Sequence, residues 1–213
     1  MPRILVLNSN TTPSVTDLVV RHMRDVLPPE VELLPATARF GAPYISTEAA
    51  YAIAGHSALD ALAEAGDGFD AVLLACFGDP GLFALKEVSA APVVGLAEAA
   101  MQEAAAHGRF SIVTGGVLWK VMLERLALAL GMDEHIASIR PITLTGAEIA
   151  ADPDAAISFL ADEARAAQRE DGAQAVILGG AALAGLAARI APLVEVPLID
   201  SVHAGARVAA RLA

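Results

Sequence analysis

The sequence predicts an α/β protein made of two similar lobes, each with a parallel sheet. Short apolar runs that are typical of buried strands alternate with segments of helical spacing along all 213 residues. This strand–helix order occurs four times and then starts again in the second half, at an offset of about 105 residues, as internal repeats do. The matched positions are Arg3 with Arg109, Cys76 with Gly180, and Pro92 with Pro197.

The first half is predicted to hold four strand–helix pairs. Apolar runs predict strands at residues 3–7, 31–34, 71–74 and 92–95, and helical spacing predicts helices at 15–26, 47–65, 82–87 and 98–107. Thr12 or Ser14 can cap the first of these helices, and Ser46 or Thr47 can cap the second.

The second half repeats this pattern. Strands are predicted at 110–113, 137–142, 175–178 and 197–199, and helices at 118–130, 152–169, 183–190 and 202–212, with Asp152 as the cap of the long one. We expect two Rossmann-like lobes related by a pseudo-twofold axis, comprising residues 1–96 plus 203–213 and residues 97–202. Because ligands of open parallel sheets bind beyond the carboxyl ends of the strands, the active site is expected in the cleft between the lobes.

Composition limits the classes of function. The net charge of −11 argues against a nucleic acid or an anionic membrane as partner, because both need basic patches. A single cysteine excludes an intrachain disulfide and a zinc site built on several cysteines, and the five histidines show no metal-ligand spacing. The apolar run at 4–7 is too short for a signal peptide and the uncharged stretch at 172–188 too short for a membrane span, so a cytoplasmic protein is expected.

The cysteine lies at a position with chemical meaning. Cys76 follows a predicted strand and precedes a predicted helix, whose free N–H groups and dipole would favour the thiolate. The alternative is a small buried apolar residue, but the neighbouring Gly78 and Pro80 favour a reactive thiol. Asp79 would either oppose the thiolate or cap the helix that follows, and the sequence leaves both open.

The turn after the first strand is unusually polar. Residues 8–12 read Asn-Ser-Asn-Thr-Thr, which is more polar side chains than helix capping requires. Simple capping is the alternative interpretation, but we favour a site for a small anion or carbonyl oxygen. Asn10 and Thr11 are the residues predicted to hold it.

Several segments in chain order resemble the aspartate/glutamate/hydantoin racemase superfamily, and most of all its hydantoin and allantoin racemase branch. The matching segments are Leu7-Asn8-Ser9-Asn10-Thr11-Thr12, Gly41-Ala42-Pro43, Ala75-Cys76-Phe77-Gly78-Asp79-Pro80-Gly81-Leu82, Pro92-Val93-Val94-Gly95-Leu96-Ala97-Glu98-Ala99, Ile177-Leu178-Gly179-Gly180-Ala181, and Pro197-Leu198-Ile199-Asp200. The segment around Cys76 is the most specific of these.

The resemblance implies a cofactor-independent, metal-free enzyme with a small carbonyl or carboxylate substrate, and a homo-oligomer is expected. Racemases of this superfamily use two cysteines on opposite faces of an acidic carbon. Cys76 matches the first, whereas position 180, where the second is expected, is glycine. The residues expected to contact substrate are Asn10, Thr11, Pro43, Phe77, Gly78, Thr114, Gly115, Gly180 and Ala181.

Three functional hypotheses follow. The first is a racemase or epimerase acting on a hydantoin-type C–H, with Cys76 as acid–base and with His203, or water beside Gly180, as the second acid. Backbone N–H groups at 77–78, 115–116 and 180–181 would stabilise the enolate. The second is a one-thiol decarboxylase or isomerase, as the resemblance to arylmalonate decarboxylases suggests. The third is a non-catalytic protein that binds small anions.

Overall fold

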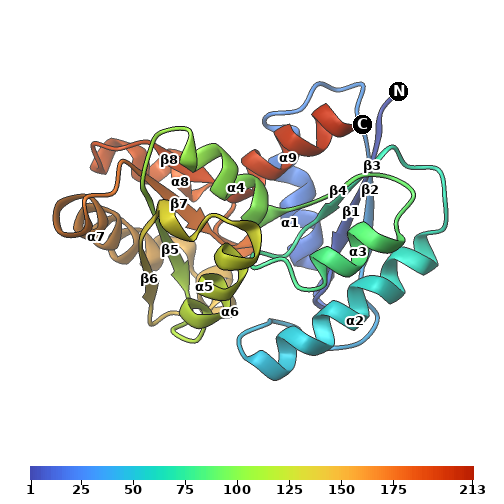
Figure 1. Ribbon diagram of the computed structural model, residues 1–213, viewed down its shortest axis with the longest axis horizontal. Helices are drawn as coiled ribbons and strands as arrows, with labels where there is room; N and C mark the ends of the chain where they lie inside the picture. The colour runs from blue at the N-terminus through green and yellow to red at the C-terminus, as the bar shows by residue number, and fades with distance from the viewer. The chain divides into compact units, whose positions relative to one another are not determined.

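A computed structural model describes residues 1–213. In it the chain forms two compact units. Lobe 1 comprises Met1–Ala99 and Val202–Ala213, and lobe 2 comprises Ala100–Ser201. Each lobe holds one four-stranded parallel sheet covered by helices, which confirms the predicted α/β class with two lobes (Figure 1).

Lobe 1 has the strand order β2-β1-β3-β4, with every pair parallel. Its elements are β1 (Arg3–Asn8), α1 (Pro13–Arg24), β2 (Glu32–Thr37), α2 (Glu48–Ala65), β3 (Ala71–Leu74), α3 (Leu82–Val88), β4 (Val93–Gly95), the start of α4 (Leu96–Ala105), and α9 (Ser201–Leu212), whose first residue closes lobe 2. All of its predicted strands and helices are present, with ends that differ by a few residues.

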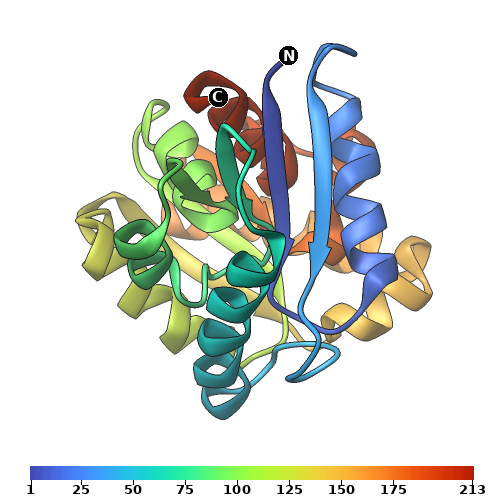
Figure 2. The same cartoon turned by 90° about the vertical axis from the view of Figure 1, so that its right-hand side faces the viewer.

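Helices cover both faces of this sheet. Figures 1 and 2 show α1 and α9 on one face and α2 and α3 on the other. Gly205 lets α9 lie close to Leu73 of β3 and to Leu96, because a Cβ at position 205 would lie 2.7 Å from Leu96 Cδ2 and 2.9 Å from Leu73 Cδ1. A Cβ on Gly81 would likewise lie 2.9 Å from the Cα of Gly55, so glycine allows α2 to approach the start of α3.

Lobe 2 has the equivalent strand order β6-β5-β7-β8, as the repeat predicts. Its elements are the rest of α4, β5 (Phe110–Gly115), α5 (Trp119–Leu130), β6 (Ile136–Ile142), α6 (Gly146–Ala151), α7 (Pro153–Asp171), β7 (Ala175–Gly179), α8 (Leu186–Ile190) and β8 (Leu198–Asp200), with short 3-10 turns at Asp133–His135, Ala181–Leu183 and Ala191–Leu193.

Three local predictions in lobe 2 need correction. Strand β5 continues through Thr114 and Gly115, which we expected in a turn. The predicted helix 183–190 is divided, because Gly185 adopts a φ of +79° that ends the first turn. Helix α6 was not predicted, although its capping box, Thr145 with Glu148, is a local signal that we overlooked.

Caps define other helix ends. Thr47 accepts from the backbone N–H of Ala50, and Asp152 accepts from that of Ala155, so both predicted caps are confirmed. Helix α1 begins at Pro13, earlier than predicted, because proline is well tolerated at a first helical position.

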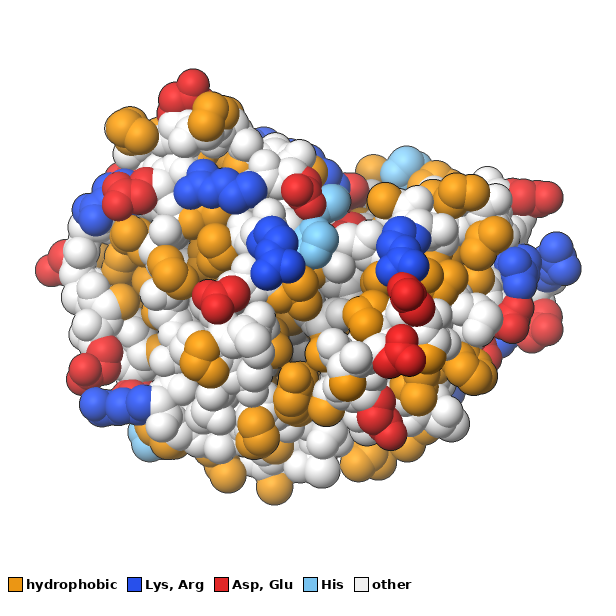
Figure 3. Space-filling view, turned by 180° about the vertical axis from the view of Figure 1, so that it is seen from behind, with side chains coloured by type: hydrophobic (Ala, Val, Ile, Leu, Met, Phe, Trp, Pro, Cys, Tyr) orange, Lys and Arg blue, Asp and Glu red, His pale blue; other side chains and the backbone are white.

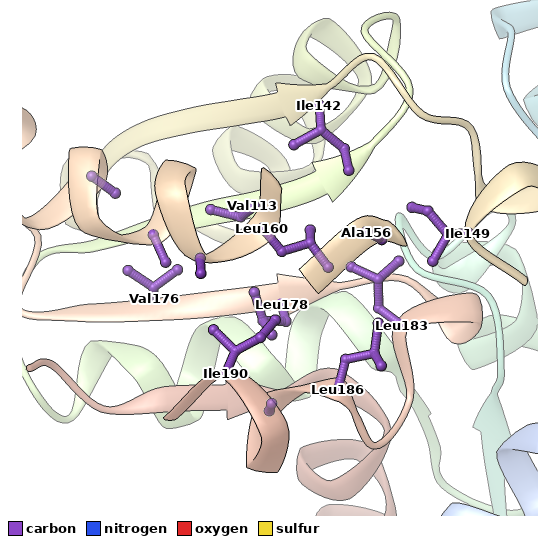
Figure 4. Close-up of a cluster of buried hydrophobic side chains, with 14 of the residues drawn as sticks. Val113, Ile142, Ile149, Ala156, Leu160, Val176, Leu178, Leu183, Leu186 and Ile190 are labelled. Carbon is purple, nitrogen blue, oxygen red and sulfur yellow. The ribbon is translucent and has the colours of Figure 1, made fainter. Parts of the chain in front are cut away.

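The core of lobe 2 lies between its sheet and helices α6, α7 and α8. Val113, Val176 and Leu178 of the strands belong to one buried cluster with Leu160 of α7, and Ile149, Leu183 and Ile190 complete this cluster (Figure 4). Alanines of α7, among them Ala156, Ala161 and Ala164, allow this helix to lie close to the sheet.

The surface is mixed in charge. On the face drawn in Figure 3, Lys and Arg side chains are interspersed with Asp and Glu, and no extended area is basic alone. A bilayer-spanning helix would need a longer apolar run than any helix here provides.

The packing around Leu160 predicts a large cavity effect. Leu160→Ala should lower the free energy of unfolding by about 2–5 kcal/mol, because the side chain is fully buried in the cluster of Figure 4. The matched control, Leu128→Ala, removes a side chain that is 66% exposed and should cost under about 1 kcal/mol. Urea unfolding of both variants measures the difference, and equal losses would contradict this packing.

Candidate active site

The turn after β1 is a buried hydrogen-bonded network. Nδ2 of Asn8 donates to Asn10 Oδ1 at 3.0 Å and to Thr16 Oγ1 at 3.0 Å. The backbone N–H of Asn10 donates in return to Asn8 Oδ1 at 3.1 Å. Asn8, Ser9 and Asn10 are all buried, so the turn is a fixed part of the lobe.

This network sets the direction of the Asn10 amide. Its Oδ1 accepts from Asn8 and also from the backbone N–H of Thr12 at 2.9 Å. A backbone N–H can only donate, so the oxygen must face Thr12 and the NH₂ group must face the other way. Asn10 therefore presents donors that suit a carbonyl or carboxylate oxygen.

The loop at residues 41–43 is attached to the same turn. Thr11 N–H donates to Ala42 O at 3.2 Å, and Thr12 Oγ1 donates to Pro43 O at 2.7 Å. These bonds bring three predicted site residues together, namely Asn10, Thr11 and Pro43. They also correct one prediction: the Thr12 side chain ties the loop in place and makes no capping bond to α1.

Cys76 leaves the sheet at the same edge as this turn. Strand β3 pairs with β1 up to Leu74 opposite Leu7, and Ala75 N–H extends the pairing to Leu7 O at 2.7 Å. Cys76 and Ser9 thus follow neighbouring strand ends. Cys76 as a residue is 7% exposed, and its thiol has Phe77 O as hydrogen-bond acceptor at the long distance of 4.0 Å.

The environment of Cys76 favours the neutral thiol. Burial raises the pKa of Cys76 to about 12, the neighbouring Ser9 hydroxyl lowers this pKa in part, and the charge of Asp79 raises it further. The expected stabilisation of a thiolate by a helix is therefore wrong for the free protein. Helix α3 begins only at Leu82, five residues after Phe77, so its first N–H groups are not adjacent in sequence to the thiol.

Phe77 and Gly78 form the turn after the cysteine. Gly78 has a φ of +99°, which favours glycine, and its carbonyl accepts from the Tyr51 hydroxyl at 2.9 Å. The backbone N–H groups of Phe77 and Gly78 make no hydrogen bond within the chain. They remain available as donors for a ligand beside Cys76.

Asp79 joins this segment to the beginning of α4. Its carboxylate accepts from the backbone N–H of Ala97 at 2.9 Å and from that of Glu98 at 2.7 Å. Asp79 therefore caps α4 and not the helix that follows it in sequence, which settles one of the open alternatives. Its charge also raises the pKa of Cys76, so the other alternative holds as well.

The Asp79 carboxyl is buried beside other charges. Burial raises the pKa of Asp79 to about 7, while its two backbone donors and the more distant Lys86 lower this pKa and Glu98 raises it. Lys86 Nζ donates to Glu98 Oε1 at 2.6 Å, which places a compensating cation near the two carboxylates.

In lobe 2 the predicted residues gather at the carboxyl ends of β5 and β7. Thr114 pairs with Gly179 in the sheet, and its hydroxyl donates to Gly179 O at 2.7 Å. Gly115 ends β5, whereas Gly180 and Ala181 directly follow β7. These four residues form one cluster within their lobe, as those of lobe 1 do in theirs.

Backbone geometry favours glycine at position 180. Gly180 has φ +143°, which side-chain-bearing residues rarely adopt, and a Cβ there would lie 2.9 Å from Leu183 Cδ1. Its N–H donates to Ser201 Oγ at 3.4 Å. One predicted enolate donor is also engaged elsewhere, because Gly116 N–H donates to Ile142 O at 3.0 Å.

Sequence reasoning missed two partners of the cysteine segment. Ser9 was seen only as part of a polar turn, although its hydroxyl lies beside the thiol. Tyr51 was not considered, although it holds Gly78 from α2. Ser9 directly follows β1, and β1 pairs with β3, which precedes Cys76. This shared position after neighbouring strands is the signal that could have identified Ser9.

Three potential metal ligands lie outside both clusters. His203, which we considered as a second acid, has its Nε2 3.7 Å from Asp25 Oδ2, and His22 Nδ1 is 2.9 Å from the same oxygen. The sequence spacing of these residues gave no indication that they would meet.

The contact between Asp79 and α4 generates a stability prediction. Asp79→Asn should lower the free energy of unfolding by about 1–2 kcal/mol, because the amide has one acceptor oxygen for two backbone donors. Gly95→Ala should also destabilise, since its Cβ would lie 2.1 Å from Asp79 Cγ.

A double-mutant cycle tests whether these effects share one contact. Gly95→Ala should cost less in an Asp79→Ala background, where the clashing carboxyl is absent. Urea unfolding of the four proteins gives the coupling, and strict additivity would show that Asp79 does not lie against Gly95.

Known proteins share this architecture along the whole chain. The family model described as Asp/Glu/Hydantoin racemase matches residues 4–209. A hydantoin racemase of Pseudomonas sp. (strain NS671) is 32% identical over 97% of this chain and 84% of its own, and one of Paenarthrobacter aurescens is 34% identical over 99% and 90%.

A solved structure of an allantoin racemase is also similar to this chain. Allantoin racemase from Klebsiella pneumoniae is 33% identical, covers 100% of this chain and 87% of its own, and superposes with a TM-score of 0.94. The two lobes with equal strand order, the cysteine segment after β3 and the polar turn after β1 therefore occur in a chain that belongs to the Asp/Glu/hydantoin racemase family of enzymes.

Proposed function

We propose that the protein is a cofactor-independent racemase or epimerase that moves a proton at an acidic C–H next to a carbonyl of a hydantoin-type compound. Relatives named hydantoin racemase and allantoin racemase, which cover nearly the whole chain, support this class of substrate. The observation that carries the proposal is the buried Cys76 thiol, placed at the carboxyl edge of the lobe 1 sheet beside a turn with fixed donors.

Cys76 is the proton-transfer group in this proposal. In the free protein its raised pKa keeps it as a thiol, the form that donates a proton to a carbanion. The thiolate left after that step is a strong base, because the same buried surroundings disfavour its charge. The carbanion forms when water on the opposite face of the carbon takes up the C–H proton, and the thiolate regains a proton from the resulting hydronium ion, so the thiol is restored. In the reverse direction the thiolate removes the C–H proton and water protonates the carbanion.

The neighbouring donors are proposed to stabilise the enolate. Negative charge develops on the carbonyl oxygen as the C–H proton leaves, and fixed donors aimed at that oxygen lower the barrier. The N–H groups of Phe77 and Gly78 and the amide of Asn10 are such donors, and all belong to lobe 1. The Asn10 amide needs no reorientation, since the turn network already fixes it.

Position 180 limits the second proton transfer. Gly180 carries no side chain, and its φ of +143° disfavours replacement by cysteine. Racemisation in this protein would therefore use water as its second acid. His203 of α9 is a poorer candidate for this second acid. It lies beside His22 of α1 and Asp25, which follows α1.

A one-thiol decarboxylase or isomerase is the second candidate. It is favoured by the presence of one cysteine, held as a neutral thiol, because a carbanion formed by loss of CO₂ needs protonation from only one side. Release of CO₂ from small malonates separates this function from racemisation. A protein that neither exchanges a C–H proton nor releases CO₂ would be the anion-binding protein considered from the sequence.

Hydrogen exchange tests the role of Cys76. Proton NMR of enantiopure hydantoins and allantoin in D₂O, followed together with optical rotation, should show loss of the C–H signal with the natural protein. Cys76→Ala should abolish this exchange, because it removes the one thiol of the chain, which is the proposed proton-transfer group.

Optical rotation distinguishes the outcomes of this experiment. Loss of both signal and rotation means racemisation, and loss of signal with rotation retained means one-sided exchange by Cys76. Exchange that persists in a folded Cys76→Ala protein, as judged by circular dichroism, would refute the proposed role of the thiol.

Asn10 gives a prediction about binding. Asn10→Asp keeps an oxygen that can accept from Asn8 and Thr12 but replaces the outward NH₂ donor with a negative oxygen. The KM for a hydantoin should rise by about tenfold or more, because a charged acceptor would face the substrate carbonyl. Steady-state kinetics checks this, and an unchanged KM with an unchanged kcat would remove Asn10 from the binding site.

The remaining expectations also belong to this proposal. The enzyme is proposed to act without cofactor or metal in its reaction, as a homo-oligomer in the cytoplasm, on a small carbonyl or carboxylate compound and not on nucleic acid or membrane. Full activity after exhaustive dialysis against a chelator would support metal-free catalysis.

A further inference from the structure

Three potential metal ligands converge in lobe 1 from two helices that are distant in sequence. His22 lies in the last turn of α1, and Asp25 is the residue that directly follows this helix. His203 lies in the first turn of α9. Their ligand atoms, two imidazole nitrogens and a carboxylate oxygen, all lie within 4.8 Å of one another. We propose that these residues form a binding site for a divalent transition-metal ion of the Zn²⁺ type.

The distances suit such an ion. Zinc lies about 2.0–2.1 Å from imidazole nitrogen, so two ligands of a tetrahedral site are separated by about 3.4 Å. His22 Nδ1 to Asp25 Oδ2 is 2.9 Å and His203 Nε2 to the same oxygen is 3.7 Å, values on either side of this spacing. Small side-chain rotations would bring all three atoms to one ion. Two imidazoles and one carboxylate leave a further position for water.

Burial and charge also suit a cation. The imidazoles are mostly buried, with side chains 22% and 21% exposed, so packing restricts their orientations. Asp25 is 55% exposed, which leaves an entry path from solvent. The chain has a net charge of −11, which favours the approach of a cation.

An ordinary ion pair explains only part of the arrangement. The contact between His22 and Asp25, three residues apart, needs no metal ion, because side chains at this spacing are neighbours on a helix surface. It does not account for a second imidazole, from another helix, directed at the same carboxylate oxygen. The two rings are 6.4 Å apart and inclined at 54°, so they do not form a stacked pair.

The proposed site is separate from the proposed reaction. Helix α1 has 12 residues and is therefore about 18 Å long. The Asn8–Thr12 turn precedes its first residue, whereas His22 and Asp25 lie at its other end. A bound ion would fasten the C-terminal helix α9 to α1 and so stabilise lobe 1.

Zinc titration of the full chain tests this inference. Calorimetry should show one Zn²⁺ per chain, and the melting temperature should rise with Zn²⁺. Asp25→Asn and His203→Gln should each weaken binding by about tenfold or more, because each removes a direct ligand. His107→Ala, at an exposed histidine outside the cluster, and Cys76→Ser should bind as the natural protein does.

Cobalt provides a second readout that needs no variant. Co²⁺ bound by two imidazoles and a carboxylate should give visible d–d bands without the charge-transfer bands of a thiolate. Absence of stoichiometric Zn²⁺ binding, unchanged affinity in both ligand variants, or loss of binding in Cys76→Ser would overturn the proposal. Racemase activity is not part of any of these measurements, so the proposed function and this site can fail independently.

Discussion

The contact between the Asp79 carboxylate and the first N–H groups of α4 determines the position of the cysteine segment. This contact joins the loop after β3 to α4. Gly95, which lacks a Cβ, leaves space for the Asp79 carboxylate. Asp79 itself adopts a φ of +53°, which is unusual for a residue with a side chain. The segment from Cys76 to Asp79 is therefore held at both ends, by the strand before Cys76 and by the cap that Asp79 makes on α4.

This constraint has an electrostatic consequence for the thiol. A buried carboxyl near Cys76 adds to the effect of desolvation, and the two together exceed the opposing effect of Ser9. The resting cysteine is thus an acid, whereas fixed N–H donors at Phe77, Gly78 and Asn10 favour negative charge on a ligand. In the proposed reaction, these groups would accept charge on the substrate oxygen and keep it off the sulfur.

Much of this could be predicted from local sequence patterns. The strands, the polar turn at 8–12 and the position of Cys76 at a strand end follow from periodicity and turn residues, and the repeat predicts the shared strand order. The pKa of Cys76 could not be predicted, because it depends on burial and on Asp79 in three dimensions. The role of Asp79 stayed open between opposing the thiolate and capping the adjacent helix, because its backbone partner at Glu98 lies 19 residues away. The meeting of His22 with His203 has no local signal at all.

A direct titration of the Cys76 thiol tests the central claim of this account. The ultraviolet absorbance of the thiolate, measured against pH in the free protein with Cys76→Ser as the blank, reports the charge of this one sulfur. Because burial raises the pKa of Cys76 to about 12, no thiolate should appear below about pH 10. A thiolate present at neutral pH would contradict the account and would mean that the resting cysteine is already a base.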